Sequence, residues 1–574
     1  MKQILKLSFV LAAAALMMGC NCFKQMSKNQ DAVKITTTPE VLVLNNGQIE
    51  ADIHVAFPAE YFNAKAVLKV TPVLVYADGE VAGTTKFFQG EKVQDNYTAV
   101  SELGGNFTQH VVFNYVEGME RCELQLRAEI KCPKGACKEF TIVNLNNGAL
   151  PTKAEQQILE EGGKAARALR QQFGLTVAYG LNTLQKDIKY GDIMEVMANN
   201  YKKVTTTVTK TDMLYAINSS KITKENRRNA NLDIFRTDVD NKLENNRATQ
   251  NISVKGYASP DGPEKFNDKL SKARSESSKK VVAKVLAETG LDVDAAAYGE
   301  DWDGFKELVA ASDIKDKNLI LQVLSLYNSP AERENEIKNL SSVFSELKSE
   351  ILPELRRAQI INSTDIQGNT DAEIMQLFAA GKTLTVEEYL YAAESLTEDP
   401  EMQVKILTAA AKSYDDARVY NNLGVALTKM DADELALKAF EKAAKFDASS
   451  ALNKNLLLAN LANGKTAEAK KYVAAVDAEA KAAVAAAEGN YTAAAKQLEG
   501  YNAAIAAVMN NDLTAAQKAI AQDKSADADY LRAVIAAKQG QLVEAKAQLN
   551  SAIKKNPELE AKAKNDILLE KVIK

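Results

Sequence analysis

The chain has 574 residues, a length that exceeds what one hydrophobic core supports, so several domains are expected. Apolar residues make up 46% of the sequence and charged residues 26%, with 11 prolines, which excludes a collagen-like or wholly disordered chain. The net charge of −5 gives no electrostatic basis for nucleic-acid binding, so no nucleic-acid partner is expected.

The N-terminal segment has the pattern of an export signal. Lys2 and Lys6 precede an apolar run at 7–18, and Gly19 precedes Cys20. The run is shorter than the ~20 apolar residues that a transmembrane helix needs, and no later stretch is long and apolar enough. The mature protein is therefore expected to have no membrane span.

Residues 16–20, with the sequence Leu-Met-Met-Gly-Cys, resemble the lipobox of bacterial lipoproteins. The resemblance implies that residues 1–19 are a lipoprotein signal peptide, that Cys20 is lipidated, and that residues 20–32 form a lipidated tether. Several acyl chains on one cysteine would hold the protein durably at a membrane. The alternative is cleavage by the general signal peptidase, which would leave Cys20 as a thiol.

No acidic run follows Cys20, where the sequence continues Asn-Cys-Phe-Lys. In lipoproteins of the Bacteroidetes type, such a run accompanies display on the cell surface. Its absence favours a protein anchored in the outer membrane and facing the periplasm.

Four further cysteines lie in a chain whose export permits disulfides. They are Cys22, Cys122, Cys132 and Cys137. A turn-like tetrapeptide at 133–136 separates Cys132 from Cys137, so a disulfide between these two is predicted, with Cys122 as an alternative partner.

Residues 33–150 are predicted to form an antiparallel β-sandwich. Apolar and polar residues alternate in short runs, as at 49–55 and 67–76. An Asn-Gly pair at 46–47 and an Asp-Gly pair at 78–79 mark turns between strands.

The next two segments differ in how clearly they can be interpreted. Residues 151–203 are predicted to form a helical connector, with helices at 153–172 and 187–203, but nothing in the sequence indicates its purpose. Residues 204–370 alternate strand and helix patterns, which predicts an α/β sandwich. The expected strands are 213–217, 251–257 and 359–361, and the expected helices are 224–245, 266–288, 305–311 and 331–350.

A motif follows the second of these strands. It comprises Gly256-Tyr257-Ala258-Ser259-Pro260-Asp261-Gly262, then Asn267, Leu270-Ser271 and Arg274. The pattern resembles the signature G-x-T-D-x-x-G-x4-N-x2-L-S-x2-R-A of the OmpA-like peptidoglycan-binding family. Over roughly 210–362, the resemblance implies the α/β fold of that family and a pocket for the diaminopimelate of a peptidoglycan stem peptide.

The resemblance identifies possible peptidoglycan-binding residues position by position. Arg274 stands at the arginine that meets the ligand carboxylate, and Asn267 stands at the family's asparagine. Ser259 replaces the aspartate that meets the ligand ammonium, and a hydroxyl cannot give the stronger, charge-assisted bond. Asp261 is an alternative carboxylate, although Pro260 restricts the loop. The segment therefore either binds peptidoglycan or serves a protein partner.

Residues 380–574 are Ala-rich and are predicted to form an all-α solenoid. The residues Tyr420, Leu423, Gly424, Leu427, Ala436, Phe440 and Ala443 reproduce the tetratricopeptide pattern W-x2-L-G-x2-Y…A-x3-F. Weaker copies follow, and a further hairpin is expected at 387–412, giving about five hairpins. Such arrays leave a curved face that docks a peptide or helix, and the alternative is a solenoid that only spaces other domains.

No enzymatic chemistry is indicated. The sequence has no G-x-S-x-G, Walker A or H-E-x-x-H motif, so no catalytic residue is assigned. His54 and His110 lie in predicted strands and the cysteine spacing is irregular for zinc, so no metal and no cofactor are expected.

The order of lipobox, β-domain, OmpA-like domain and tetratricopeptide repeats resembles envelope lipoproteins of the Bacteroidetes. The resemblance implies a non-catalytic, periplasm-facing outer-membrane scaffold that organises or assists a membrane protein assembly in biogenesis, secretion or uptake. Its expected partners are the outer membrane, through the lipid, and envelope proteins. The alternative is a cell-wall tether that binds peptidoglycan directly through Arg274.

Overall fold

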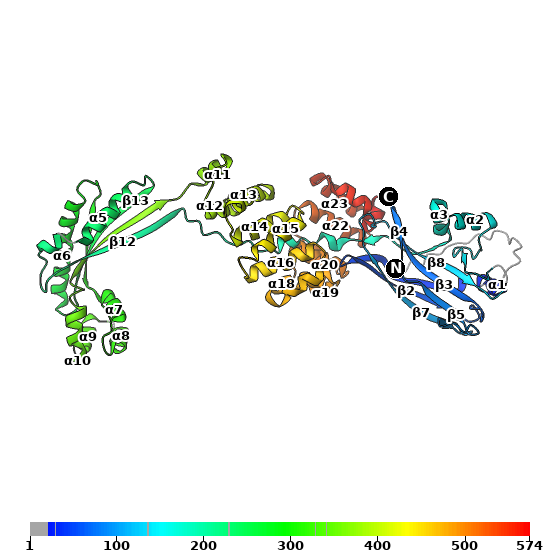
Figure 1. The fold of residues 1–574 in the computed structure, drawn as a ribbon, viewed down its shortest axis with the longest axis horizontal. Coiled ribbons are helices and arrows are strands. Elements are labelled where there is room, and N and C mark those ends of the chain that lie inside the picture. Colours follow the sequence, from blue (N-terminus) through cyan, green and yellow to red (C-terminus); the bar gives the residue numbers. More distant parts are fainter. Residues whose placement is uncertain are drawn as a thin grey trace. The chain divides into compact units, whose positions relative to one another are not determined.

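The chain folds as two compact units in the computed structural model (Figure 1). The described residues are 21–28, 30–134, 137–227, 230–327, 329–339 and 341–573. The first unit comprises Met1–Ala198 and Thr397–Lys574, and the second comprises Asn199–Leu396. The predicted lipidation site, Cys20, lies outside the described residues.

The N-terminal part of the first unit is rich in β-sheet, as predicted. Its strands are β1 (Lys34–Asn45), β2 (Gln48–Phe57), β3 (Val67–Tyr76), β4 (Gly79–Ala82), β5 (Lys86–Gly90), β6 (Thr98–Val100), β7 (Gly105–Asn114), β8 (Glu123–Lys131), β9 (Thr141–Val143), β10 (Leu175–Tyr179) and β11 (Leu181–Asn182). One sheet has the order β11-β1-β2-β7, and the other has the order β10-β8-β3-β5-β6. Apolar residues from both sheets, such as Ile49 and Leu124, meet in one core, because alternate side chains of a strand point to the same face.

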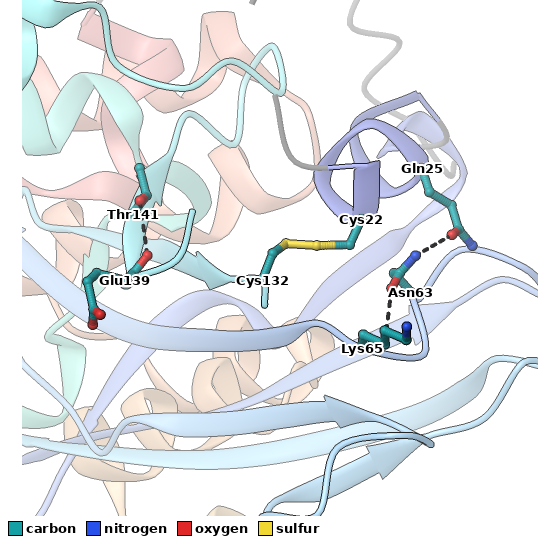
Figure 2. Close-up of a disulfide and its surroundings, with 7 residues drawn as sticks. All are labelled: Cys22, Gln25, Asn63, Lys65, Cys132, Glu139 and Thr141. Carbon is teal, nitrogen blue, oxygen red and sulfur yellow. Dashed lines mark hydrogen bonds between the residues drawn. A yellow bond between two sulfur atoms is a disulfide. The ribbon is translucent and has the colours of Figure 1, made fainter. Parts of the chain in front are cut away.

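A disulfide joins Cys22 to Cys132 in this core (Figure 2). The predicted disulfide between Cys132 and Cys137 is therefore wrong, because the sulfur of Cys132 is bonded to Cys22. The two residues nevertheless lie close together, since the N–H of Cys132 donates to the carbonyl oxygen of Cys137 at 2.7 Å. The sequence placed these two residues close together but did not reveal the partner 110 positions away.

The helix α1 (Asn21–Lys28) packs on the sandwich. Its residues Cys22 and Met26 are buried in the sandwich core. The predicted tether at 20–32 is wrong over α1, because a helix with one face in the core cannot act as a free linker.

The predicted helix at 153–172 is divided in two. The helices are α2 (Lys153–Glu161) and α3 (Gly163–Phe173), and Gly162 between them has φ of 77°. This left-handed conformation suits glycine and ends α2.

The second predicted connector helix, at 187–203, is wrong. Residues 184–198, which we name the strap, have two 3-10 turns, η2 (Leu184–Asp187) and η3 (Tyr190–Asp192), and no regular structure after them. Several of the strap's peptide groups bond to side chains of the C-terminal helices. These bonds replace the main-chain bonds that a helix would have supplied.

The C-terminal part of the first unit is all-helical, as predicted, and is consistent with a tetratricopeptide-like array; we name it the helical array. Its elements are α13 (Pro400–Ser413), α14 (Ala417–Thr428), α15 (Asp433–Ala443), α16 (Ser450–Ala462), α17 (Thr466–Ala469), η5 (Lys470–Ala475), α18 (Ala478–Ala487), α19 (Tyr491–Ala494), α20 (Gly500–Met509), α21 (Leu513–Ala519), α22 (Ala526–Lys538), α23 (Leu542–Lys555), α24 (Leu559–Asn565), η6 (Ile567–Leu569) and α25 (Glu570–Ile573). Side chains of Asp416, Ser449 and Ser525 cap α14, α16 and α22, satisfying N–H groups that the helices leave unpaired.

The two helices of the first clear repeat cross closely at the glycine of its motif. A Cβ atom at Gly424 of α14 would lie 2.6 Å from Cζ of Phe440 in α15. The phenyl ring therefore occupies the space that the glycine leaves free. The predicted upstream hairpin is divided, because α12 (Val386–Ser395) belongs to the second unit and α13 to the first.

The second unit has a sheet with helices packed on it. The strands are β12 (Val204–Leu214), β13 (Ala248–Ala258), β14 (Val293–Glu300) and β15 (Arg357–Gln367), in the order β12-β15-β13-β14. The helices are α4 (Lys224–Arg227), α5 (Ala230–Leu243), α6 (Glu264–Val285), α7 (Trp302–Ala311), α8 (Lys317–Leu326), α9 (Pro330–Asn339), α10 (Ser341–Glu346) and α11 (Asp371–Ala379), with the π-turn η4 (Leu347–Ile351). Phe235 of α5 and Val282 of α6 share a core with Val254 of β13.

The strands of this sheet differ in part from the predicted ones. The predicted strand 213–217 overlaps only the end of β12, whereas 251–257 and 359–361 lie inside β13 and β15. The strand β14, which pairs parallel to β13, was not predicted. Its buried and exposed positions do not alternate regularly, so the period-2 pattern is weak there.

Candidate functional site

The four predicted peptidoglycan-binding residues lie where β13 ends and α6 begins. Asn267 is buried, and its Nδ2 lies 2.9 Å from Oε1 of Glu300, 3.1 Å from the carbonyl oxygen of Gly262 and 3.2 Å from that of Ser259. Burial raises the pKa of Glu300 above its ordinary value. Asn267 therefore holds the loop after β13 in place with bonds inside the protein.

Arg274 is 1% exposed, and its donors bond to main-chain carbonyls. Nε donates to the carbonyl oxygen of Ser219 at 2.9 Å, Nη1 to that of Tyr257 at 2.9 Å, and Nη2 to that of Ala216 at 3.3 Å. Burial lowers the pKa of Arg274 to about 10, so it remains a cation at neutral pH. The guanidinium joins three segments of the unit and is covered by them.

Ser259 and Asp261 also have partners inside the protein. The hydroxyl of Ser259 donates to the carboxylate of Asp261, and Nη2 of Arg356 lies 3.6 Å from Oδ2 of Asp261. Arg356 was not identified from the sequence, because it lies in the segment before β15, far from the motif. All four predicted residues are thus brought together, and the bonds they make are internal to the unit.

A second site, not identified from the sequence, is the face of the helical array that contacts the strap. Three asparagines each bind both the N–H and the C=O of one strap residue. Asn422 of α14 binds Met197 with both distances at 2.8 Å. Asn455 of α16 accepts from the N–H of Glu195 at 2.8 Å and donates to its carbonyl oxygen at 2.7 Å.

We name each of these asparagines a clamp, and the third clamp binds the strap nearer to its N-terminal end. Asn502 of α20 accepts from the N–H of Lys189 at 2.8 Å and donates to its carbonyl oxygen at 3.0 Å. Near this point Gln185 donates to the carbonyl oxygens of Ala486 and Ala487 at 2.7 and 3.0 Å. The three asparagines bond to main-chain groups of the strap, so they recognise its backbone and not a particular side chain, whereas Gln185 bonds through its own side chain.

Charged side chains add to the clamps. Lys454 of α16 lies 3.0 Å from Glu195 of the strap and 2.7 Å from Asp477. Burial opposes the charge of Lys454, but Asp477 and Glu195 hold its pKa above the ordinary value. Lys189 of the strap forms a further ion pair, with Asp527 of α22.

The strap also buries apolar side chains in the core of the array. They are Leu184, Ile188, Ile193 and Met194. Each buried aliphatic side chain contributes roughly 1.5–3 kcal/mol relative to exposure in water. The strap is therefore a packed part of the first unit, and the face it covers is already occupied.

The clamps had a sequence signal that was missed. Asn422 directly precedes Leu423-Gly424 in the first repeat, and Asn455 directly precedes Leu456-Leu457 in the next one. An asparagine that recurs at one position of a repeat points to a shared polar role on one face of the array.

The described residues contain no group of three or more His, Cys, Asp or Glu side chains arranged to hold a metal ion. His54 bonds to Thr108 and His110 to Asp52, each at 2.9 Å on the sandwich. In the part of the chain that the structure describes, no helix has the length and apolar character needed to cross a membrane.

No protein-family model matches the chain, and no curated protein matches it. One similar solved structure is described as "YrrB: a TPR protein with an unusual peptide-binding site"; it has 17% identity and a TM-score of 0.18, and covers 34% of this chain and 99% of that one. Because this TM-score does not establish a common fold, the description of the helical array depends on its own repeats and hairpins.

Proposed function

We propose that the chain is a non-catalytic lipoprotein scaffold of the outer membrane, faces the periplasm, and organises or assists a membrane protein assembly in biogenesis, secretion or uptake. The observation that carries the scaffold part of the proposal is the strap bound along the helical array, and the lipid anchor is proposed from the lipobox-like residues before Cys20. Three bidentate asparagine clamps and four buried apolar side chains join the array to the chain that leaves the sandwich. Such a connection suits a scaffold, which must hold its binding surfaces at constant spacing.

The proposal changes where protein partners are expected to bind. A tetratricopeptide array typically receives a peptide on its concave face, but here the clamp residues Asn422, Asn455 and Asn502 already bind the strap. We propose that envelope proteins contact other surfaces of the chain. The array then binds an extended segment, as a docking array does, but that segment is its own strap. Toward the rest of the protein it acts mainly as a spacer, which was the other alternative that its sequence left open.

The alternative function, a cell-wall tether, receives less support from the geometry. A diaminopimelate ligand would need an arginine with donors directed outward and a carboxylate without a cation. Arg274 is covered and bonded to three carbonyls, and Asp261 has Arg356 as its cationic partner. Binding of the ligand would require these bonds to be broken first.

Sedimentation with purified sacculi tests scaffold against tether. The full chain is used with Cys20→Ala, which removes the lipid and its non-specific adhesion. We expect the protein to stay in the supernatant, and we expect Asp261→Ala to leave this result unchanged. Sedimentation that is saturable and is lost in Asp261→Ala or Asn267→Ala, with each variant shown to be folded, would favour the tether.

Fractionation of cells tests the anchor. The chain with Cys20 is expected in the outer-membrane fraction, and Cys20→Ala is expected in the soluble periplasmic fraction, because the acyl chains supply the durable attachment. If Cys20→Ala still sediments with outer membranes in high salt, a protein partner and not the lipid is the main anchor.

A further inference from the structure

The disulfide determines where a lipid on Cys20 would be attached to the sandwich. Cys22 is bonded to Cys132 and buried, and it lies only two positions after Cys20. Consecutive Cα atoms are about 3.8 Å apart, so the Cα of Cys20 lies within about 8 Å of that of Cys22 whatever the conformation. An acyl group on Cys20 is therefore held at one end of the sandwich and not on a long linker.

The surface at this end is built from three segments that bond to one another. The side chain of Gln25 in α1 accepts from Asn63 at 2.8 Å (Figure 2). It also donates to the carbonyl oxygen of Glu60 at 2.7 Å. The N–H of Glu60 donates to the carbonyl oxygen of Glu102 at 2.8 Å. The helix, the loop after β2 and the turn before β7 thus form one continuous surface beside the attachment point.

Leu103 projects from that turn and is 87% exposed. The turn is closed by the N–H of Gly104, which donates to the carbonyl oxygen of Ser101 at 2.9 Å. Gly104 has φ of 80°, and a Cβ at this position would overlap the carbonyl oxygen of Phe57, so the turn requires glycine and has little freedom. This leucine is held outward on a rigid turn, and its side chain is not covered by any of the described residues.

We propose that this end of the sandwich lies on the surface of the lipid bilayer, with the side chain of Leu103 inserted among the headgroups. The inference rests on the proposed lipid anchor at Cys20 and adds the face that meets the membrane. The bilayer is the occupant that the connectivity favours, because the residue that would carry the acyl chains is only two positions before the buried Cys22. The surface exposes two basic residues, Lys24 and Lys65, and two acidic ones, Glu60 and Glu102. Because these charges balance, they do not draw the surface to a bilayer, and the contact depends on the lipid anchor and on Leu103.

Tryptophan fluorescence in vesicles that contain brominated lipid tests the proposal. The chain has one tryptophan, Trp302, so Trp302→Phe removes the native tryptophan fluorescence from the full acylated chain. Leu103→Trp is the reporter. Val116→Trp is the matched control, because Val116 is 51% exposed and follows the other end of β7, where Asn114 pairs with Gln48.

We expect the brominated lipid to quench Leu103→Trp at least twofold more strongly than Val116→Trp, with a blue-shifted emission of the former. The mass of the N-terminal peptide is measured on the same sample. An acylated chain in which both reporters are quenched equally, or neither is, would overturn the membrane-facing surface while leaving the anchor intact. A chain without an acyl group would overturn the anchor and this inference together.

Discussion

The clamps on the strap can be tested by removing one of them. Asn455→Ala deletes two bonds to Glu195, at 2.7 and 2.8 Å, and one to Asn421 at 2.8 Å. A hydrogen bond contributes about 0.5–1.5 kcal/mol net, so the two strap bonds together are worth roughly 1–3 kcal/mol. This corresponds to a roughly 5- to 150-fold increase in the local opening of the strap.

Hydrogen exchange of the strap measures this opening directly. Peptides that cover 184–198 are expected to exchange faster in Asn455→Ala, with the largest effect at the amide of Glu195. Asn460→Ala is the matched control, since Asn460 is also buried in α16 but donates to the carbonyl oxygen of Leu456 in its own helix. The strap of this control is expected to exchange as in the wild type.

Two outcomes would refute the reasoning. If the strap of Asn455→Ala keeps the wild-type protection, the clamp contributes nothing to holding it. If Asn460→Ala opens the strap as much as Asn455→Ala does, the effect comes from weakening α16 and not from the lost bonds.

Three further predictions concern stability. The double variant Cys22→Ser, Cys132→Ser is expected to lower the free energy of unfolding of the sandwich by about 2–5 kcal/mol, because the bond closes a long loop; an unchanged midpoint in urea would refute this. Gly424→Leu is expected to cost roughly 1–3 kcal/mol or more, because the new side chain meets Phe440. Hydrogen exchange should then rise in α14 and α15 only, and a rise throughout both units would contradict the expectation. Arg274→Ala removes one donor from each of three carbonyls and is expected to destabilise the second unit by about 3 kcal/mol; full stability in urea unfolding would show that the arginine is not structural.

The parts of the fold that could be predicted are those determined by residues close to one another in the sequence. The alternating runs of the sandwich and the repeat around Gly424 depend on neighbours a few residues apart or one repeat away, so they can be recognised from one sequence. The motif identified Gly424 and Phe440 as repeat positions, but it was the structure that showed them packed against each other.

The missed features depend on partners far apart in the sequence. The strap takes its conformation from asparagines such as Asn422, which lies 225 positions from Met197. Cys22 bonds to Cys132 across 110 positions, although Cys137 lies much nearer to Cys132 in the sequence. In the motif around Arg274, the sequence predicted which residues lie close together. It did not predict that carbonyl oxygens of another segment already accept the hydrogen bonds of the arginine.

Affinity purification of the tagged chain from native membranes tests the scaffold proposal most directly. Membranes are divided into two portions, one of which is digested with a muramidase before solubilisation, and Cys20→Ala serves as the control. The account predicts that an integral outer-membrane protein co-purifies in constant proportion from both portions and is depleted with Cys20→Ala. Recovery of peptidoglycan fragments alone, lost after digestion, would contradict the scaffold and support the tether.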